Sequence, residues 1–299
     1  MTELMCTRIL PQKDTYVKTD LYGLSLKCDW FIHKTDIINI TDTKSPKYIY
    51  LLNRMGYITI PFFVNTVLPS IIDPIVVIIA GDDFTFPMGD KDDRDNFYHD
   101  IQHIVNILIN STIITKIYVE NLDTLHTKLV PIPLGILNHN KQLYKNIKIP
   151  KLSTRKIQVF CAHQVREGTQ WKNRKIVKDL CITKWENIVY FQDSLTEIEF
   201  KHFLLNSKFC ICVNGGGIDP SPKVWQALLC GCIPIIQRSS LDEAYSRFPV
   251  IYIDEWVDDC ITQEKINIWF DQTTIEIEQK KIANMLTLNY WWNIISSNL

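Results

Sequence analysis

Residues 208–256 read KFCICVNGGGIDPSPKVWQALLCGCIPIIQRSSLDEAYSRFPVIYIDEW, and this stretch decides the fold. It begins with a short apolar run, Lys208–Val213, which predicts a buried strand. Asn214–Gly217 predicts a loop, because glycine adopts positive φ at little steric cost. A helix then begins with Ser221 as its N-cap, and the β-branched run Ile233–Ile236 predicts the next strand. Strand, glycine loop, helix and strand in this order predict half of a nucleotide-binding α/β unit.

The glycine loop and the helix start together predict an anion-binding site. Unpaired backbone N–H groups at a helix N-terminus attract negative charge, and the helix dipole adds to that attraction. The missing side chains let a diphosphate approach the backbone, and Lys223 adds an ammonium in the first turn. The alternative is that the loop only joins two core elements.

The wider pattern resembles a known enzyme family. The residues that carry the resemblance are Gly217, Asp219, Ser221, Trp225, Ala227–Leu228, Gly231–Ile236, Leu241–Asp242 and Phe248–Val250. They fall where the exostosin-like glycosyltransferases, which have the GT-B architecture, place similar residues. The segment KVWQALLCGCIPII also resembles the donor motif of α1,3-fucosyltransferases.

Two positions depart from the exostosin-like pattern. Lys223 stands where that group usually has Arg, and Gln226 stands where it has Glu. In many enzymes of this architecture the Glu holds the ribose of the donor. Gln226 can still form hydrogen bonds to a hydroxyl, but it carries no charge, so the resemblance leaves both the donor and the activity open.

A second point of resemblance lies upstream. Ile132–Gly135 is similar to the hinge motif of the exostosin-like group, and Asn121 matches an upstream Asn of that pattern. The resemblance therefore extends over roughly residues 75–260. It implies an α/β fold of the GT-B type, with two Rossmann-like domains whose parallel sheets face a cleft.

A polar, lysine-rich segment, residues 138–153, predicts the linker between two domains. We expect an N-terminal Rossmann-like domain on the acceptor side over residues 1–145. A C-terminal nucleotide-sugar-binding domain is expected over residues 146–275. Residues 276–299 predict a C-terminal helix that crosses back to the first domain, as the resemblance to the GT-B architecture implies.

Composition limits the class of protein. The chain has 299 residues, of which 46% are hydrophobic and 22% charged, as is typical of a globular protein. Its formal net charge of −1 gives no broad attraction to nucleic acid. The most apolar stretch, residues 58–80, is interrupted by prolines and polar residues, and Met1–Leu10 lacks the apolar core of a signal peptide. We therefore expect a cytoplasmic protein, or a fragment of a longer one, that has no nucleic-acid partner and no membrane span.

The nine cysteines indicate a reducing compartment rather than a disulfide framework. Cys210 and Cys212 form one C-x-C pair, and Cys230 and Cys232 form another, each beside or within a predicted strand. Alternate residues of a strand share a face, so such pairs can supply zinc ligands. Buried structural thiols are the preferred interpretation.

Two acids follow a continuous apolar run, Ile75–Ala80, which predicts a buried parallel strand. Open α/β sheets bind ligands outside the carboxyl ends of their strands. Asp82 or Asp83 is therefore the predicted general base that takes a proton from an acceptor hydroxyl. The alternative is a helix cap or a solvated turn. His163, after the predicted strand 157–162, is the next candidate for the base.

The resemblance also implies which residues hold the donor. A basic residue after the first strand of the second domain faces the diphosphate in GT-B enzymes; Arg174 matches that place best and Arg166 is the alternative. The predicted donor-binding residues are Arg166, Arg174, Asn214, Gly215, Gly216, Gly217, Asp219, Ser221, Lys223 and Gln226.

Asp90-Lys91-Asp92 is a D-x-D string, a pattern that holds a divalent metal in another glycosyltransferase architecture. It lies in an acidic loop instead of directly after a strand, which favours a solvated turn. We therefore predict no metal site.

The sequence leads to one expectation and two alternatives. We expect a metal-independent glycosyltransferase of glycan biosynthesis, a hexosyl- or pentosyltransferase, that moves a sugar from a UDP- or GDP-sugar to a hydroxyl of a glycan or glycoprotein. It would use no cofactor, because backbone dipoles and cations offset the charge of the leaving group. The first alternative is a metal-dependent transferase that uses Asp90 and Asp92. The second is a catalytically silent nucleotide- or carbohydrate-binding protein, which Gln226 favours.

Overall fold

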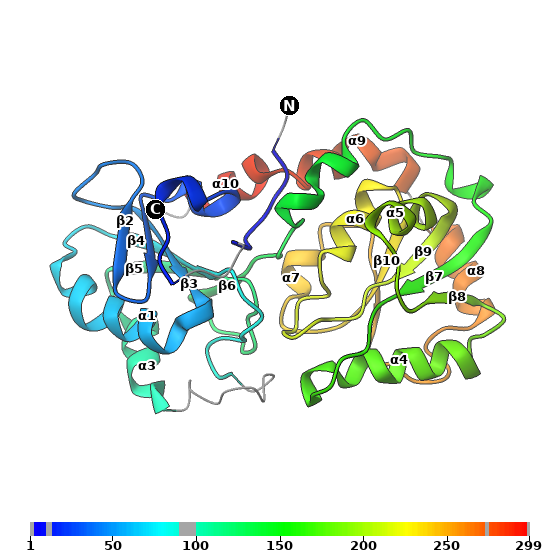
Figure 1. Cartoon of the computed structure of the whole chain (residues 1–299), viewed down its shortest axis with the longest axis horizontal. Helices are drawn as coiled ribbons and strands as arrows, with labels where there is room; N and C mark the ends of the chain where they lie inside the picture. The colour runs from blue at the N-terminus through cyan, green and yellow to red at the C-terminus, as the bar shows by residue number, and fades with distance from the viewer. Residues whose placement is uncertain (1–2, 10–13, 90–99, 273–274, 298–299) are drawn as a thin grey trace. The chain divides into compact units, whose positions relative to one another are not determined.

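The computed structural model describes residues 3–9, 14–89, 100–272 and 275–297. The chain forms two compact units, drawn in Figure 1. Unit 1 comprises Met1–Leu134, Gly216–Asp219 and Thr287–Leu299, and unit 2 comprises Gly135–Gly215 and Pro220–Leu286.

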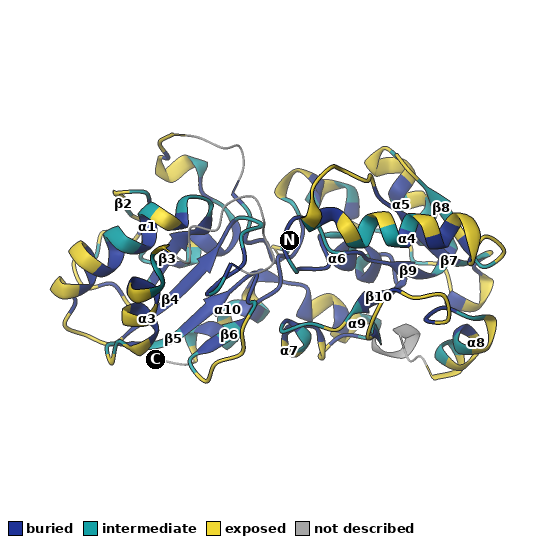
Figure 2. Cartoon of the chain, turned by 90° about the horizontal axis from the view of Figure 1, so that it is seen from below, coloured by how far each residue is buried: buried dark blue, intermediate teal, exposed yellow. Residues whose placement is uncertain are grey.

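Unit 1 is built on a six-stranded sheet in the order β2-β1-β3-β4-β5-β6. Its strands are β1 (Trp30–His33), β2 (Asp36–Asn39), β3 (Tyr48–Leu52), β4 (Ile75–Ala80), β5 (Ile114–Val119) and β6 (Leu129–Pro131). All neighbours are parallel except β1 and β2. Every residue of β4 is buried, as expected for an inner parallel strand covered on both faces (Figure 2).

Helices cover this sheet on both sides. The segment from β3 to β4 contains η3 (Asn53–Met55), α1 (Gly56–Phe62), the π-helical turn η4 (Phe63–Val67) and η5 (Leu68–Ser70), and α3 (Gln102–Asn110) precedes β5. The opposite side, as Figure 1 shows, carries α10 (Leu288–Ser296), which contacts η2 (Gly23–Lys27). The hydroxyl of Tyr118 on β5 donates a hydrogen bond to the carbonyl oxygen of Ile294 at 3.2 Å, which ties α10 to the sheet. One more 3-10 turn, η1, spans Lys18–Asp20.

Unit 2 is built on a five-stranded parallel sheet in the order β11-β10-β9-β7-β8. Its strands are β7 (Ile157–Ala162), β8 (Val189–Gln192), β9 (Ser207–Ile211), β10 (Ile233–Gln237) and β11 (Ile251–Ile253). Read from β8, the chain order is 2-1-3-4-5, which is the flavodoxin-like doubly wound arrangement. The chain leaves β7 toward one edge and returns to β9 on its other side. The switch point, where such sheets bind ligands, therefore lies at the carboxyl ends of β7 and β9.

The helices of unit 2 connect these strands. They are α4 (Lys172–Thr183), α5 (Glu197–Asn206), α6 (Lys223–Leu229), α7 (Asp242–Tyr245), α8 (Gln263–Gln272) and α9 (Ile275–Met285), with 3-10 turns η6 (Asn138–Tyr144), η7 (Leu152–Thr154) and η8 (Thr169–Trp171). Helix α6 lies in the core: Val224, Trp225, Ala227 and Leu228 are buried, and the indole N–H of Trp225 donates to the carbonyl oxygen of Leu286 at 3.2 Å. Across the described ranges of both units, no helix combines the length and apolar character needed to cross a bilayer.

The predicted α/β fold with two parallel sheets is confirmed, and three local predictions are wrong. Ser221 is not the N-cap of α6, because it has a φ of 76° and Pro222 occupies that place. The spacing of Ser194 and Glu197 predicts a capping box, but the box at the start of α5 pairs Thr196 with Glu199. The run Phe62–Ile72 predicts one helix, yet helical structure begins six residues earlier at Gly56 and changes to π and 3-10 turns before Ile71.

Candidate functional site

Unit 2 contains a cavity of about 350 Å³ whose walls come from the segments that follow β7, β8 and β9. That volume is within the usual range of small-molecule sites, roughly 300–1,000 Å³. Six predicted site residues line it: His163, Arg166, Arg174, Ser221, Lys223 and Gln226. The fold thus brings these residues together at the switch point of the sheet, although they span much of the second half of the chain.

Lys223, the first residue of α6, places an ammonium group in the wall of this cavity. Its Nζ is buried and has no hydrogen-bond partner among the residues that the structure describes. Burial, followed by the positive charge of Arg174, lowers the pKa of Lys223 from 10.5 to about 8. A buried ammonium without a counter-ion is unfavourable. Its burial therefore costs stability in the ligand-free protein and leaves a positive charge without a partner in the cavity wall.

Two arginines add to the positive charge of the cavity. The guanidinium of Arg174 lies 4.7 Å from the ring centroid of Trp171, and that of Arg166 lies 5.1 Å from it. Nε of Arg174 donates to the carbonyl oxygen of Asn214 at 3.1 Å. Burial, and then the charge of Arg166, lowers the pKa of Arg174 to about 10. Within the described ranges neither arginine forms an ion pair, and nor does Lys223, so the cavity is lined by three cations without an ion-pair partner there.

Gln226 and Glu197 add a neutral amide and a carboxylate to the same cavity. The side chain of Gln226 is buried, and Nε2 donates to Oε2 of Glu197 at 2.9 Å. Glu197 is the first residue of α5 and also lines the cavity. The carboxylate that the exostosin-like pattern places at position 226 is therefore absent, and a carboxylate from another helix lies against the Gln that replaces it.

His163 is held by both of its ring nitrogens. Nε2 lies 2.8 Å from the carbonyl oxygen of Arg174, an acceptor only, so this nitrogen carries the proton. Nδ1 lies 3.5 Å from Sγ of Cys161, whose thiol can donate to it. A role as general base would require one of these contacts to break, which favours a positioning role.

The three glycines of the predicted anion loop are not in the left-handed region. Positive φ occurs at other glycines of the chain, so the expectation that Gly215, Gly216 and Gly217 need it is wrong. Close packing explains two of them instead. A Cβ on Gly216 would lie 2.7 Å from Oδ2 of Asp83, and a Cβ on Gly217 would lie 2.4 Å from Oδ1 of Asn121. A side chain at Gly217 would also meet the backbone oxygen of Asp83 at 2.5 Å and does not fit, whereas one at Gly216 would require the carboxylate of Asp83 to move.

The boundary between the two units falls within the predicted anion loop, after Gly215. Asn214 and Gly215 belong to unit 2, whereas Gly216, Gly217 and Asp219 belong to unit 1. Oδ1 of Asn214 accepts a hydrogen bond from the side-chain amide of Asn173 at 3.0 Å, as part of unit 2. A Cβ on Gly215 would meet the guanidinium of Arg174 at 3.4 Å, an ordinary van der Waals distance.

Asn121 fixes the end of this loop on unit 1. Its Oδ1 accepts hydrogen bonds from the backbone N–H groups of Ile218 (3.1 Å) and Asp219 (3.0 Å), and its Nδ2 donates to the carbonyl oxygen of Asp82 at 2.9 Å. The buried carboxylate of Asp219 accepts from the backbone N–H of Leu134 at 3.2 Å. These contacts give Asp219 a structural role.

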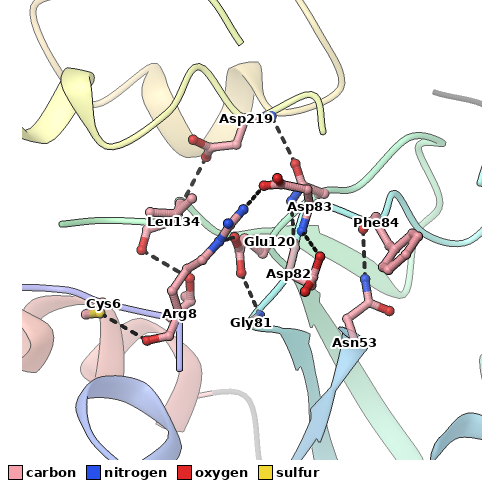
Figure 3. A network of polar contacts seen from close by, with 12 residues as sticks. Cys6, Arg8, Asn53, Gly81, Asp82, Asp83, Phe84, Glu120, Leu134 and Asp219 are labelled. Carbon is pink, nitrogen blue, oxygen red and sulfur yellow. Dashed lines mark hydrogen bonds and ion pairs between the residues drawn. The ribbon is translucent and has the colours of Figure 1, made fainter. Parts of the chain in front are cut away.

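Asp82 and Asp83 lie at the carboxyl end of β4, and each contacts an arginine. Figure 3 shows the contact of Asp83 with Arg8. Nε of Arg54 donates to Oδ2 of Asp82 at 2.6 Å, and Oδ1 of Asp82 accepts from the backbone N–H of Asp83 at 2.7 Å. Arg8 forms an ion pair with Oδ1 of Asp83. Both oxygens of Asp82 are thus engaged, while Oδ2 of Asp83 accepts no hydrogen bond from the described residues.

Glu120 is a third acid of this network, and the sequence reasoning missed it as a site residue. It follows β5 directly and its side chain is fully buried. Oε2 accepts from the backbone N–H of Gly81 at 2.7 Å, and Oε1 accepts from Nε of Arg8 at 3.3 Å. Burial raises the pKa of Glu120, and the charge of Arg8 opposes that rise. An acid directly after a largely apolar strand is the same signal that singles out Asp82 and Asp83, and it could have identified Glu120.

The alternative metal ligands Asp90 and Asp92 lie outside the described residues. Among the residues that are described, no group of three or more His, Cys, Asp or Glu side chains has an arrangement able to hold a metal ion. The paired cysteines are buried free thiols, and burial raises the pKa of Cys212, Cys230 and Cys232.

Comparisons with known proteins give a likeness in fold. No protein-family model matches the chain, and no curated protein sequence matches it. Among solved structures, it is similar to the spinosyn rhamnosyltransferase SpnG complexed with thymidine diphosphate. That match has a TM-score of 0.41 and 12% sequence identity, and covers 81% of this chain and 69% of the other.

Proposed function

We propose that this chain is a glycosyltransferase that moves a sugar from a nucleotide-diphosphate sugar to a hydroxyl. The observation that carries the proposal is the buried, unpartnered ammonium of Lys223 in a cavity that Arg166 and Arg174 also line. Three cations without acidic partners, placed at the switch point of a doubly wound sheet, suit a ligand with more than one negative charge. A nucleoside diphosphate has that charge and the size of such a site.

The same cations would act in the reaction. When the bond between sugar and diphosphate breaks, negative charge develops on the leaving phosphate. Lys223, Arg166 and Arg174 would stabilise that charge, so the proposed mechanism needs no metal ion. Asn214 and Gly215, the remaining loop residues of unit 2, would contact the donor through their backbone. The exostosin-like resemblance makes UDP- and GDP-sugars the first donors to test, and the two departures at Lys223 and Gln226 leave the identity of the donor to that test.

The general base is the second part of the proposal. A base must reach the proton of the acceptor hydroxyl with an oxygen that is not already occupied. Asp83 meets the second condition through Oδ2, whereas both oxygens of Asp82 are engaged. We therefore assign the base to Asp83, with Asp82 and His163 as the alternatives, and the hydroxyl of a glycan or glycoprotein as the acceptor.

Calorimetry and turnover together test this function. UDP, GDP and inorganic pyrophosphate are titrated into the wild type, Lys223→Met and Lys184→Met, which removes an exposed lysine paired with Asp258. We expect at least one nucleotide to bind the wild type and the Lys184 variant, and to bind Lys223→Met about tenfold or more weakly, the range for a hydrogen bond to a charged group. Equal affinity in all three proteins would contradict the phosphate role.

Turnover separates the enzyme from a silent binding protein. Release of free UDP or GDP from the matching nucleotide sugar is measured with a panel of glycan acceptors. Release that depends on the acceptor supports the transferase. Release that persists in EDTA indicates that no metal takes part, and release that EDTA abolishes indicates that one does. Tight nucleotide binding without release from any donor would favour the binding protein instead.

A further inference from the structure

Unit 1 contains a cavity of its own, of about 290 Å³. Its walls come from Trp30, the first residue of β1, and from the segments 44–46 and 70–73, which precede β3 and β4. These positions lie at the amino ends of parallel strands, whereas Asp82 and Asp83 follow the carboxyl end of β4. At roughly 3.3 Å per residue β4 alone is about 17 Å long, so this cavity is separate from the predicted base site.

The apolar part of the wall combines an indole ring with aliphatic side chains. Trp30 is half-buried, and its indole N–H donates to the carbonyl oxygen of Thr43 at 3.1 Å, which fixes the orientation of the ring. Ile71 is buried, but Ile72 is 89% exposed, more than any other large hydrophobic residue that the structure describes. The cavity therefore presents a fixed aromatic ring and an exposed aliphatic side chain to a ligand.

The polar part of the wall carries groups of both charges. Lys44 and Asp73 are exposed, and within the described ranges neither forms an ion pair. Ser45 and Ser70 add hydroxyl groups. Oγ of Ser70 donates to the carbonyl oxygen of Val67 at 2.7 Å, so its lone pairs remain as acceptors. The wall thus offers donors and acceptors of hydrogen bonds, and its two charges cancel.

A hexopyranose ring matches both parts of this wall. Its C–H groups form an apolar face for Trp30 and Ile72, and each of its hydroxyl groups can donate and accept hydrogen bonds. An anion suits the cavity less well, because Asp73 would repel it as strongly as Lys44 would attract it. A purely apolar ligand would desolvate both charges without replacing their hydrogen bonds. The volume, near the lower end of the usual range of roughly 300–1,000 Å³, favours a small ligand.

We propose that this cavity is a carbohydrate-binding site for an uncharged hexopyranose residue. Its ligand is a residue of the acceptor glycan at a distance from the reacting hydroxyl; this second step rests on the proposed function, whereas sugar binding itself does not. The cavity anchors the acceptor chain on unit 1 and takes no part in the chemistry. Long acceptors therefore bind more tightly than short ones, because two contacts on one chain reinforce each other.

Saturation-transfer NMR and calorimetry test sugar binding directly, without any nucleotide. The methyl glycosides of glucose, galactose, mannose and N-acetylglucosamine are titrated into the wild type, Ile72→Ser and Asp73→Asn. The matched controls are Ile107→Ser on α3 and Asp179→Asn on α4, which change exposed residues outside both cavities. Free glutamine and phenylalanine are the zwitterionic comparison probes.

We expect at least one methyl glycoside to bind the wild type and both controls, with a dissociation constant roughly in the millimolar range for a ligand of this size. Ile72→Ser and Asp73→Asn should each weaken that binding about fivefold or more, since one removes apolar contact and the other a charged acceptor. Both variants change exposed side chains, and circular dichroism checks that they fold.

The inference is wrong if no methyl glycoside binds the wild type, if Ile72→Ser and Asp73→Asn keep full affinity, or if the amino acids bind in place of the sugars. None of these results changes nucleotide binding or turnover, on which the proposed function stands. Sugar binding in a protein that releases no nucleotide with any acceptor would support the site and overturn its role in holding an acceptor.

Discussion

The carboxylate of Glu120, at the end of β5, accepts a 2.7 Å hydrogen bond from the backbone N–H of Gly81, at the end of β4. It joins the carboxyl ends of two neighbouring strands below the ion pair of Arg8 with Asp83 (Figure 3). Because Glu120 is fully buried, its charge needs compensation, which the N–H of Gly81 and Nε of Arg8, 3.3 Å from Oε1, both supply. Arg8, from the first residues of the chain, is therefore a structural requirement of the predicted base site.

Arg8→Met should destabilise the protein by about 3–5 kcal/mol at pH 8, the usual cost of leaving a buried charge unpaired. The pKa of Glu120 is already raised in the folded state, so the folded state binds its proton more tightly than the unfolded state does. Stability from this group is present at low pH and is lost as pH rises through the folded pKa. Loss of Arg8 raises that pKa further, so the deficit should shrink from pH 8 to pH 5, as measured by urea unfolding.

Two variants sharpen that experiment. Glu120→Gln added to Arg8→Met removes the buried charge and should recover part of the stability. Arg238→Met removes an arginine from exposed ion pairs and should change stability by about 1 kcal/mol or less. A deficit for Arg8→Met that is the same at both pH values would contradict the role given to Glu120.

Asp83→Asn should lower turnover about a hundredfold or more while leaving the affinity for UDP or GDP nearly unchanged. The side chain keeps its shape but loses the basic oxygen, and a missing base affects the chemical step. Asp82→Asn is the matched comparison and should cost less, because both oxygens of Asp82 already accept hydrogen bonds. The measurements are kcat, KM and calorimetric Kd. A larger loss of kcat for Asp82→Asn would assign the base to Asp82.

Gly217→Ala should destabilise the protein by about 1–3 kcal/mol, the usual range for forcing extra atoms into a packed site. The added Cβ would lie 2.4 Å from Oδ1 of Asn121 and 2.5 Å from the backbone oxygen of Asp83, neither of which can move freely. Gly215→Ala is the control, since its Cβ would meet only ordinary contacts, and should cost less than about 1 kcal/mol. Urea midpoints that are equal for the two variants would contradict the packing explanation.

The fold could be predicted where local pattern decides it. Continuous buried runs such as Ile75–Ala80 and Ile157–Ala162 are strands as expected, because a parallel strand covered on both faces must be apolar throughout. The first strands of unit 1, Trp30–His33 and Tyr48–Leu52, were missed. The aromatic residues in Tyr48–Leu52 favour a strand. Both strands are short and have polar neighbours, so the alternation of apolar and polar residues is too brief to be recognised.

The contacts of the candidate site could not be predicted, since partners distant in sequence make them. Arg8 and Glu120 are 112 residues apart, and Asn121 and Ile218 are 97 apart. The glycines illustrate the difference. Their presence in the sequence predicted a backbone with positive φ. The structure shows that Gly216 and Gly217 lack a side chain because Asp83 and Asn121 pack closely against them. Lys223 could be singled out from its place at a helix start, but its burial without a partner required the fold.

Lys223→Met should stabilise the ligand-free protein by about 1–3 kcal/mol at pH 7. The pKa of Lys223 falls from 10.5 to about 8 on folding, and each unit corresponds to about 1.4 kcal/mol against the charged form. Below pH 8 both states are protonated, so the full cost is present. Between pH 8 and 10.5 the unfolded state holds more protons than the folded one, so stability rises with pH. The gain over wild type should therefore shrink from pH 7 to pH 10, relative to Lys184→Met. A constant gain would show that the ammonium is not desolvated.

The last prediction concerns protons that accompany nucleotide binding. At pH 8 about half of the wild-type molecules carry the proton on Lys223, because its pKa is about 8. A bound diphosphate favours the charged ammonium and raises that pKa, so binding of UDP or GDP should take up as much as about half a proton. The free nucleotide releases none at pH 8, since its last phosphate pKa is about 6. Calorimetric titrations in buffers of different ionisation enthalpy measure the uptake. At pH 6 Lys223 is already protonated and about half of the free nucleotide carries a proton on its last phosphate, so binding there should release protons instead of taking them up. The uptake at pH 8 should disappear in Lys223→Met, while Lys184→Met retains it. Binding at pH 8 without proton uptake, or with equal uptake in Lys223→Met, would place the diphosphate away from this lysine.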